Sequence, residues 1–171
     1  MENFKHYDEA SAKFYDTLNI KTVPVLSWDF QYLFLNDIKE SFQDLIRINA
    51  IATKSKWSSN NWDIESRLNN EVIILTDAKL EIVFASHNIV KMNGYIEAEV
   101  LGKSPKMFHG KETCLKISNE IREAVLLQQP FEKTVLNYKK NGETYQCEIK
   151  GFPVFNIKGE LSHFIAFEKA A

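Results

Sequence analysis

The dipeptide Asn141-Gly142, set between two β-rich stretches, restricts the fold of this chain more than any other feature. Asn-Gly is a preferred centre for a two-residue hairpin turn, because both residues tolerate a positive φ angle. It separates residues 131–139 from residues 145–154, and a third β-rich stretch follows at 161–168. Strands joined by tight turns pair antiparallel, so the chain is predicted to end in three antiparallel strands.

A second hairpin is predicted upstream of these strands. Residues 72–76 and 82–85 are rich in β-branched side chains and flank a short turn. Helical segments are predicted over the following ranges: 88–93, 96–101 and 113–128. The order of two strands, helices and three strands predicts an α+β fold, in which a five-stranded antiparallel sheet carries the helices on one face.

The longest of these helices, over residues 113–128, has Thr113 as its predicted N-cap. Its predicted apolar face comprises Ile117, Ile121, Ala124 and Gln128. A helix of this kind packs one side on the sheet and leaves the other in solvent.

Residues 1–65 are predicted to form an N-terminal helical extension. The first helix is indicated by apolar residues at helical spacing before Pro24: Phe4, Tyr7, Phe14 and Leu18. A second helix is predicted to begin at Asp37, whose spacing from Glu40 is that of a capping box. The predicted apolar face of this second helix comprises Ile38, Phe42, Leu45 and Ile46.

The last strand is apolar on both of its faces, which indicates a covering layer on the outer side of the sheet. Phe164 and Ala166 share one face, and Ile165 and Phe167 share the other. Because the N-terminal helices each have a single apolar face, they are predicted to pack near Ile165 and Phe167. This contact is expected within one chain or across a homodimer.

Composition and charge narrow the class of protein. The net charge is −2, so no basic surface for nucleic acid is indicated. The sequence shows neither a signal peptide nor an apolar run long enough to span a bilayer, so a cytoplasmic protein away from membranes is expected. Cys114 and Cys147 stand far apart without a CxxC pattern, as reduced thiols in the cytoplasm would.

Six phrases, in this order, carry a family resemblance: Ile74-Leu-Thr-Asp77, Ile82-Val-Phe-Ala-Ser86, Met92-Asn-Gly-Tyr95, Glu99-Val-Leu-Gly102, Asn137-Tyr-Lys-Lys-Asn-Gly142 and His163-Phe-Ile-Ala166. Each phrase alone is weak, but the ordered set occurs at the spacing of PAS domains. Residues 70–169 therefore resemble a PAS domain, which implies the PAS fold and a sensory role.

Residues 84–138 further resemble, without a gap, the flavin-binding light sensors of the LOV type. Where those sensors carry Gly-Arg-Asn-Cys-Arg-Phe-Leu-Gln-Gly, this chain has Gly102-Lys-Ser-Pro-Lys-Met-Phe-His-Gly110. The resemblance places Pro105 at the photoactive cysteine. Proline has no nucleophile that could add to a flavin, so no cysteinyl–flavin photocycle is expected.

The same resemblance implies four candidate pocket-lining positions: Thr76, Asn137, Cys147 and Glu168. Asn137 matches a flavin-contacting Asn, whereas Cys147 replaces a second Asn and Glu168 replaces a Gln. Losing these amides removes hydrogen-bond donors, which speaks against FMN but leaves it open. A plainer interpretation also stays open, in which Asn137 bonds the local backbone and Glu168 lies in solvent at a frayed strand end.

The sequence shows no catalytic or metal-binding motif. Haem is not expected either, because PAS relatives usually ligate it from the long helix, and residues 113–128 contain no histidine. The favoured function is a sensory module without catalytic activity, which signals through a small ligand in its cavity or through contact with another protein. The alternative is a LOV-like flavin receptor with non-adduct chemistry. The expected partners are a second copy of the chain or a separate signalling protein.

Overall fold

The computed structural model describes Lys13 and residues 27–58 and 62–171. The strands are β1 (Val72–Asp77), β2 (Ile82–Ala85), β3 (Phe131–Tyr138), β4 (Thr144–Phe155) and β5 (Leu161–Ala170). The helices are α2 (Ser27–Lys54), α3 (Ile64–Leu68), α4 (Ile89–Asn93), α5 (Glu97–Val100) and α6 (Leu115–Leu126), with a 3₁₀ turn η1 at Pro105–Phe108. Each strand lies within about two residues of its predicted position.

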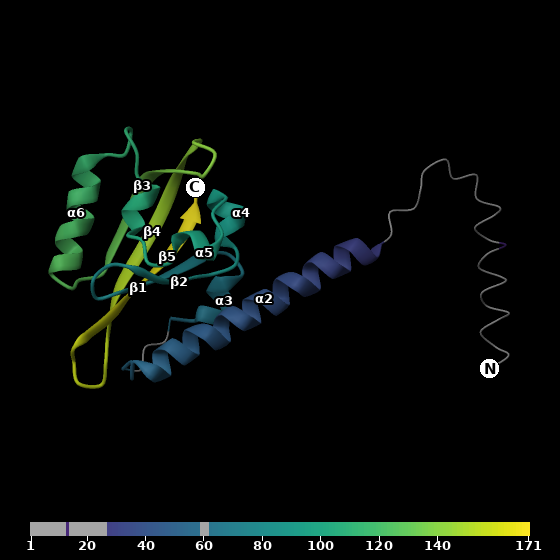
Figure 1. Cartoon of the computed structure of the whole chain (residues 1–171), viewed down its shortest axis with the longest axis horizontal. Coiled ribbons are helices and arrows are strands. Elements are labelled where there is room, and N and C mark those ends of the chain that lie inside the picture. The colour runs from purple at the N-terminus through teal and green to yellow at the C-terminus, as the bar shows by residue number, and fades with distance from the viewer. Residues whose placement is uncertain (1–12, 14–26, 59–61) are drawn as a thin grey trace. The chain divides into compact units, whose positions relative to one another are not determined.

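The five strands form one antiparallel sheet in the order β2-β1-β5-β4-β3 (Figure 1). The hairpin between β3 and β4 turns at Asn141-Gly142 as predicted, but its loop is longer than two residues: Lys139 bonds Glu143, and only Gly142, with a φ of 89°, takes a positive φ. Pairing of β1 with β5 brings the last strand to the centre of the sheet, with Ile74 opposite Ala166. The predicted fold class, the five strands and their antiparallel pairing are confirmed.

The two faces of the sheet are covered by different helices. Ile74 on β1 faces a cluster with Ile89, Val100 and Phe108, which come from α4, α5 and η1. The neighbouring Ile73 and Leu75 point the other way, as alternation along a strand requires. The helices that follow β2 therefore lie on one face, and the described residues of α2 and α3 that contact the sheet lie on the other.

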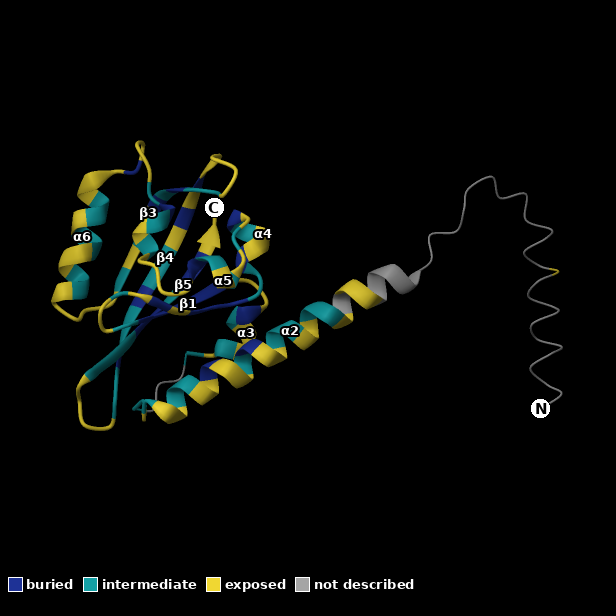
Figure 2. Ribbon diagram, viewed as in Figure 1, coloured by how far each residue is buried: buried dark blue, intermediate teal, exposed yellow. Residues whose placement is uncertain are grey.

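On the extension's face, α2 and α3 pack on the middle of the sheet. Ile48 of α2 is fully buried in one cluster with Ile165 and Phe167 of β5, and Leu45 and Ile51 border it. Figure 2 shows this contact as the dark blue part of α2 beside the sheet. The prediction that the second N-terminal helix covers Ile165 and Phe167 is confirmed, within one chain.

The segment after α2 fastens the end of the helix to the sheet. Trp57 forms an isolated β-bridge with Asn156, and its indole Nε1–H donates to His163 Nδ1 at 3.1 Å. Ser58 donates its backbone N–H to Phe155 O at 2.8 Å. These bonds link the turn after the helix to β4 and β5.

Two predictions about the extension are wrong. The helix begins at Ser27 rather than Asp37, so Asp37 lies inside it and caps nothing. Of the predicted apolar face only Leu45 packs on the sheet, whereas Ile38, Phe42 and Ile46 are exposed. The reason is the rotation of the helix. Asp44, Ile48 and Ile51 face the sheet, and they lie on the side of the helix opposite to Ile38, Phe42 and Ile46. The predicted first helix, from Phe4 to Leu18, lies outside the described residues.

Contacts divide the chain between Leu35 and Asn36, and residues 36–171 form one compact unit. The sheet, its covering helices and the C-terminal two-thirds of α2 belong to this unit. The sequence-based division into residues 1–65 and 70–169 stays a prediction. In the described part of the chain, no helix combines the length and the apolar character needed to cross a membrane.

Candidate functional site

A cavity of about 240 Å³ lies between the sheet and α6. Its wall is mostly apolar, and it is formed by β1, β3, β4 and β5 on one side and by η1 and α6 on the other. The apolar residues that line it are Ile74, Leu80, Pro105, Phe108, Ile121, Val125, Leu126, Phe131, Ile149, Phe164 and Ala166. A mostly apolar cavity with a few polar groups suits a small organic ligand.

Two polar atoms inside the wall lack partners. Thr76 and Asn137 line the cavity, and both residues are buried. The Thr76 hydroxyl oxygen Oγ1 and the Asn137 amide oxygen Oδ1 have no hydrogen-bond partner among the described residues. A buried polar atom without a partner costs about 1–3 kcal/mol, so each of these two atoms needs a ligand, a water or, for Asn137, the equally unpartnered hydroxyl of Tyr145 on the neighbouring strand.

Glu168 is the third buried polar residue in the wall, and it is 4% exposed. Burial raises its pKa to about 7, because the carboxylate would lose its hydration, and a hydrogen bond from Cys147 opposes that rise. The thiol of Cys147 lies 3.6 Å from Glu168 Oε2. Near neutral pH a large share of Glu168 is therefore a neutral carboxylic acid, which can donate a hydrogen bond as an amide would.

The structure thus places three of the four candidate residues in the cavity wall. Thr76, Asn137 and Glu168 line it, and the interpretation of Glu168 as a solvated strand end is wrong, because β5 continues to Ala170. Cys147 is not part of the wall, and its thiol lies against Glu168, which is. Burial also raises the pKa of the Cys147 thiol, so that group stays protonated. The binding roles of all four residues stay predictions.

Positive charge gathers at the solvent side of the cavity. Lys106 of η1 and Arg122 of α6 both line it and are both exposed. His109 lines it as well, and burial, with the Lys106 charge in second place, lowers the pKa of its imidazole. Arg122 was not among the residues predicted to line the cavity, although it shares one face of α6 with Ser118 and Val125, which also line it.

The predicted apolar face of α6 is right in part. Ile121 lines the cavity, together with Ser118, Arg122 and Val125, and Ile117 and Ala124 are half-buried, but Gln128 does not belong to this face. Gln128 lies beyond the helix, is exposed and has a φ of 53°. α6 has no fully buried residue, so no dense core fixes its rotation. The predicted cap is also wrong, because Thr113 instead donates its hydroxyl to Leu136 O at 2.7 Å.

Neither of the chain's two cysteines lines the cavity. Pro105, which the sequence resemblance is expected to place at the photoactive cysteine of LOV domains, does line it. Cys114 is exposed at the start of α6, and Cys147 is buried behind Glu168. Neither thiol therefore lies where it could add to a ligand in this cavity.

Comparison with known families decides the classification of this region. The PAS domain profile matches residues 70–169, which is the sheet together with the helices α4 to α6. The chain belongs to the PAS domain family. PAS domains and their LOV branch are sensory modules of signal transduction, and this PAS domain is one of them.

Two curated relatives match the PAS domain. The nitrogen fixation regulatory protein of Klebsiella oxytoca is 31% identical over 97 residues, which cover 57% of this chain and 20% of that protein. Protein TWIN LOV 1 of Arabidopsis thaliana is 36% identical over 88 residues, or 51% of this chain and 22% of that protein. The chain thus matches about a fifth of the length of these relatives.

Solved LOV structures share the fold. The light-state dimer of the fungal blue-light photoreceptor Vivid superposes with a TM-score of 0.55 at 28% identity, over 57% of this chain and 76% of that one. The light-state Aureochrome1 LOV domain gives 0.58 at 22% identity, over 65% of this chain and 89% of that one. The resemblance of this PAS domain to the LOV branch is confirmed.

A second polar cluster fastens α2 to the PAS domain. Asp44 of α2 is buried, and its Oδ2 accepts the backbone N–H of His87 at 2.7 Å and lies 2.9 Å from the ring Nδ1. Arg47 donates to Glu97 at 2.6 Å, and its guanidinium lies over the ring of Phe84. No sequence pattern pointed to these contacts, because the partners are 43 and 50 residues apart.

The outer part of this cluster includes a group that could ligate a metal. One ligand atom from each of Asp37, Glu40 and His87 lies within 4.8 Å of the others. However, the ammonium of Lys91 is bonded to Asp37, and this bond, with help from His87, holds the pKa of that carboxyl below its ordinary value. We therefore assign the cluster to holding α2 in place rather than to a metal.

Proposed function

We propose that this PAS domain is a sensor without catalytic activity, which binds a small organic molecule in its cavity and signals through α2. The single observation that carries this proposal is the pair of unpartnered atoms, Thr76 Oγ1 and Asn137 Oδ1, inside a mostly apolar cavity. A cavity kept for packing alone would have apolar groups at these positions, because each unpartnered atom lowers stability.

The polar groups specify the chemistry of this ligand. The oxygens of Asn137 and Thr76 can accept a hydrogen bond from a donor on the ligand. The protonated carboxyl of Glu168 can donate a hydrogen bond to an acceptor on the ligand. Lys106 and Arg122 favour a negative group at the solvent side of the cavity. The proposed ligand is therefore a compact, mostly apolar molecule with a donor and an acceptor at one end and an anionic group at the other.

A flavin mononucleotide is the second candidate ligand. The observation that favours it is that two cations, Lys106 and Arg122, line the cavity. These two cations would hold the phosphate, while Asn137, Thr76 and neutral Glu168 would bond the polar edge of the ring. When bound, a flavin would supply light absorption or one- and two-electron redox chemistry. Pro105 in the wall supports a receptor that works without a cysteinyl adduct.

The proposed signal path crosses the central strands. On β5, Glu168 faces the cavity while its neighbour Phe167 packs against α2, and Thr76 and Leu75 divide in the same way on β1. A ligand that changes the bonding of Glu168 would shift these strands and alter how α2 packs. α2 would then pass the change to a second copy or to a separate signalling protein. Two free cysteines support a reducing compartment, and we propose the cytoplasm.

The test is native mass spectrometry of the purified full chain, followed by denaturation and identification of any released compound. We expect a small molecule in the wild type and its loss in Ala166→Leu, which fills the cavity. Ala124→Leu makes the same change on α6 outside the cavity wall and should keep the molecule.

A visible spectrum separates the two candidates, because a flavin colours the protein yellow. Retention of the compound in Ala166→Leu, with the melting temperature unchanged, would contradict the cavity as its site. Binding that raises the melting temperature of the wild type and not of Ala166→Leu would support it.

A further inference from the structure

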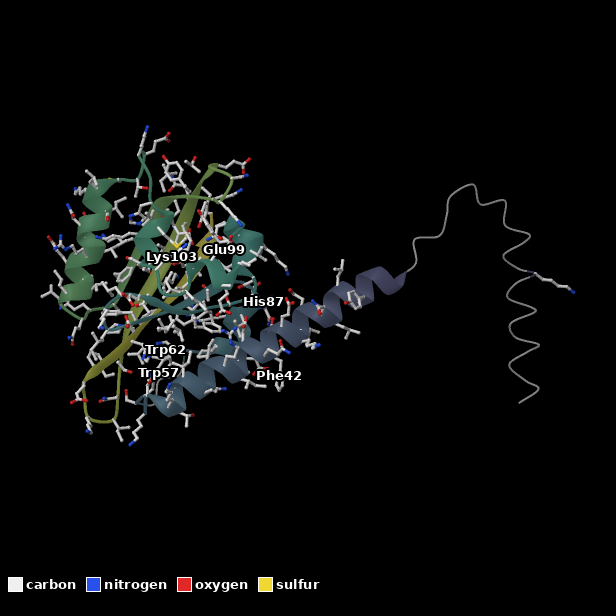
Figure 3. All side chains as sticks on the ribbon, in the orientation of Figure 1. Phe42, Trp57, Trp62, His87, Glu99 and Lys103 are labelled. Atoms are coloured by element: carbon white, nitrogen blue, oxygen red, sulfur yellow. The ribbon has the colours of Figure 1, made fainter. Side chains whose placement is uncertain are left out.

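The bond between Trp57 and His163 joins the C-terminal end of α2 to the sheet. Trp57 stands three residues after the last residue of α2, and Figure 3 shows it beside that end of the helix. Its indole Nε1–H donates to Nδ1 of His163 on β5 at 3.1 Å. On β5, His163 alternates in step with Ile165 and Phe167, the residues on which α2 packs. The bond therefore lies at the edge of the contact between α2 and the sheet.

The indole of Trp57 determines which form of His163 can make this bond. An indole N–H donates and cannot accept, so the nitrogen opposite it must offer a lone pair. An imidazole offers a lone pair at Nδ1 only in its neutral form, because both ring nitrogens of the imidazolium carry protons. The Trp57–His163 bond therefore exists only while His163 is neutral.

A different acceptor lies ready for a proton on this nitrogen. Ser162 Oγ lies 2.7 Å from His163 Nδ1. A hydroxyl can donate to a neutral imidazole nitrogen, and it can rotate to accept from a protonated one. A protonated Nδ1 can therefore bond Ser162, whereas the indole N–H of Trp57 would then face another donor and repel it.

We infer that the Trp57–His163 bond makes the end of α2 sensitive to acid: it holds this end on the sheet while the imidazole is neutral, and it is lost when the imidazole takes up a proton. The half-buried indole N–H would then lack an acceptor, which favours exposure of Trp57 to water. The backbone bonds of Ser58 with Phe155 and of Ile157 with Lys56 do not depend on this proton. Acid should therefore loosen the end of the helix without detaching it.

The surroundings of His163 oppose its protonation. Burial lowers the pKa of its imidazole below the ordinary 6.5, because the imidazolium would lose its hydration, and the charge of Asp77 on β1 acts against that change. Asp77 is the partner of His163 in the β1–β5 register, and its partner on β4 is the uncharged Val154. The folded state thus binds fewer protons at His163 than the unfolded state. The stability that this contact contributes is complete above about pH 6.5 and is lost as the pH falls through the lowered pKa.

His87 contacts the middle of α2 and does not share this behaviour. Its ring nitrogens lie 2.9 Å from a carboxylate oxygen of Asp44 and 3.2 Å from one of Asp37. Both carboxylates accept, so an imidazolium at His87 would bond both of them. A proton at His87 therefore favours the contact with α2, whereas a proton at His163 removes one.

NMR titration of the imidazole Cε1–H resonances in the full chain tests the state of His163, whose signal is assigned by its absence in His163→Asn. We expect His163 to titrate below the ordinary 6.5. Trp57→Phe should raise its pKa toward that value, because the proton no longer competes with the indole for Nδ1. The resonance of His87 is the internal control, and Trp57→Phe should leave its titration unchanged.

Hydrogen exchange measures the loosening itself, with each rate divided by the intrinsic rate at the same pH. Between about pH 7.5 and 5.5, the wild type should lose roughly tenfold in protection over residues 50–58, the end of α2 and the segment after it. His163→Asn places an amide oxygen that does not titrate near the position of Nδ1, so its protection should not depend on pH. Trp57→Phe lacks the donor, and it should be less protected at pH 7.5 and lose nothing further in acid.

The inference adds a second input to α2 and needs no ligand, so it can fail while the proposed function holds, and the reverse. An ordinary or raised pKa for His163, a pKa that Trp57→Phe leaves unchanged, or a loss of protection in acid that persists in His163→Asn would each overturn it.

Discussion

The two faces of the central strands differ in how completely they are filled. Toward α2, Ile73, Leu75, Ile165 and Phe167 pack against Ile48, and all are at most 1% exposed. Toward α6, the same two strands border a cavity of about 240 Å³ with unpartnered polar atoms. The first face therefore provides the stability of the sheet, and the second provides room for a ligand.

This difference teaches how a binding site and an output helix can share two strands. Cavities lower stability because their walls lose contacts, so a fold that keeps one needs a dense face elsewhere. Here the dense face belongs to α2, the element to which we assign signalling. Any change of strand position at the cavity is then transmitted to a well-packed contact rather than to a loose one.

The largest loss of stability is expected when a buried side chain is truncated on the face of the sheet that packs against α2. Ile48→Ala removes a fully buried side chain from the contact of α2 with the sheet. We expect a loss of about 2–5 kcal/mol in the free energy of unfolding, measured by urea denaturation. Ile46→Ala truncates the same residue type on the exposed side of α2 and should cost less than about 1 kcal/mol in the monomer. Equal losses for the two variants would contradict the position of α2.

The next largest effect comes from Glu168 on the cavity face. Its pKa is raised to about 7 in the folded protein, above the ordinary 4.5, so the folded state binds more protons than the unfolded state between these values. The free energy of unfolding should therefore fall as the pH rises from about 4.5 to 7, by roughly 3 kcal/mol at most, and should then level off.

Glu168→Gln provides the control, because an amide does not titrate. Histidines also titrate in this window, so the difference between the wild type and Glu168→Gln isolates the contribution of Glu168. Thermal melting at a series of pH values gives that difference. Parallel stability curves for the two proteins would show that Glu168 is not buried as a neutral acid.

Local patterns predicted the sheet well because its determinants are local. Turn residues such as Gly142 and β-branched runs act within a few positions of each other, and the strands follow from them. The burial of Glu168 could not be predicted from such local patterns. It depends on the register that sets Glu168 between Val72 of β1 and Ile149 of β4, which are distant in sequence.

The helices were harder to predict because tertiary contacts determine their boundaries and faces. Asp37 has the spacing of a helix cap with Glu40, yet it lies inside α2 and bonds Lys91, 54 residues away. On α6 several apolar residues are half-buried on neighbouring faces, and only the position of the cavity decides which of them line it. The cavity itself leaves no sequence signal, because a void has no residues of its own.

A smaller effect is expected where polar groups join α2 to the PAS domain. Asp44→Ala would leave the backbone N–H of His87 without its 2.7 Å acceptor and would also free Arg47 from one partner. A loss of about 1–3 kcal/mol is expected, because a buried donor would be unsatisfied. Hydrogen exchange should report faster exchange at His87 and along residues 36–54, with β3 and β4 unchanged. If hydrogen exchange became faster over the whole sheet instead, Asp44 would not act only on the local contact between α2 and the PAS domain.

The smallest effect is expected from truncating the cavity wall, and it sharpens the comparison of the two faces most directly. Val125→Ala on α6 and Val154→Ala on β4 remove the same two methyl groups, but Val125 is half-buried beside an existing cavity, whereas Val154 is fully buried on the α2 face. Val154→Ala should cost about 2–3 kcal/mol of unfolding free energy, and Val125→Ala less than about 1 kcal/mol, because its neighbours already face empty space. Urea denaturation of ligand-free protein measures both. If Val125→Ala were as costly as Val154→Ala, the α6 face would be a packed core, and the cavity on which the proposed function depends would not exist in solution.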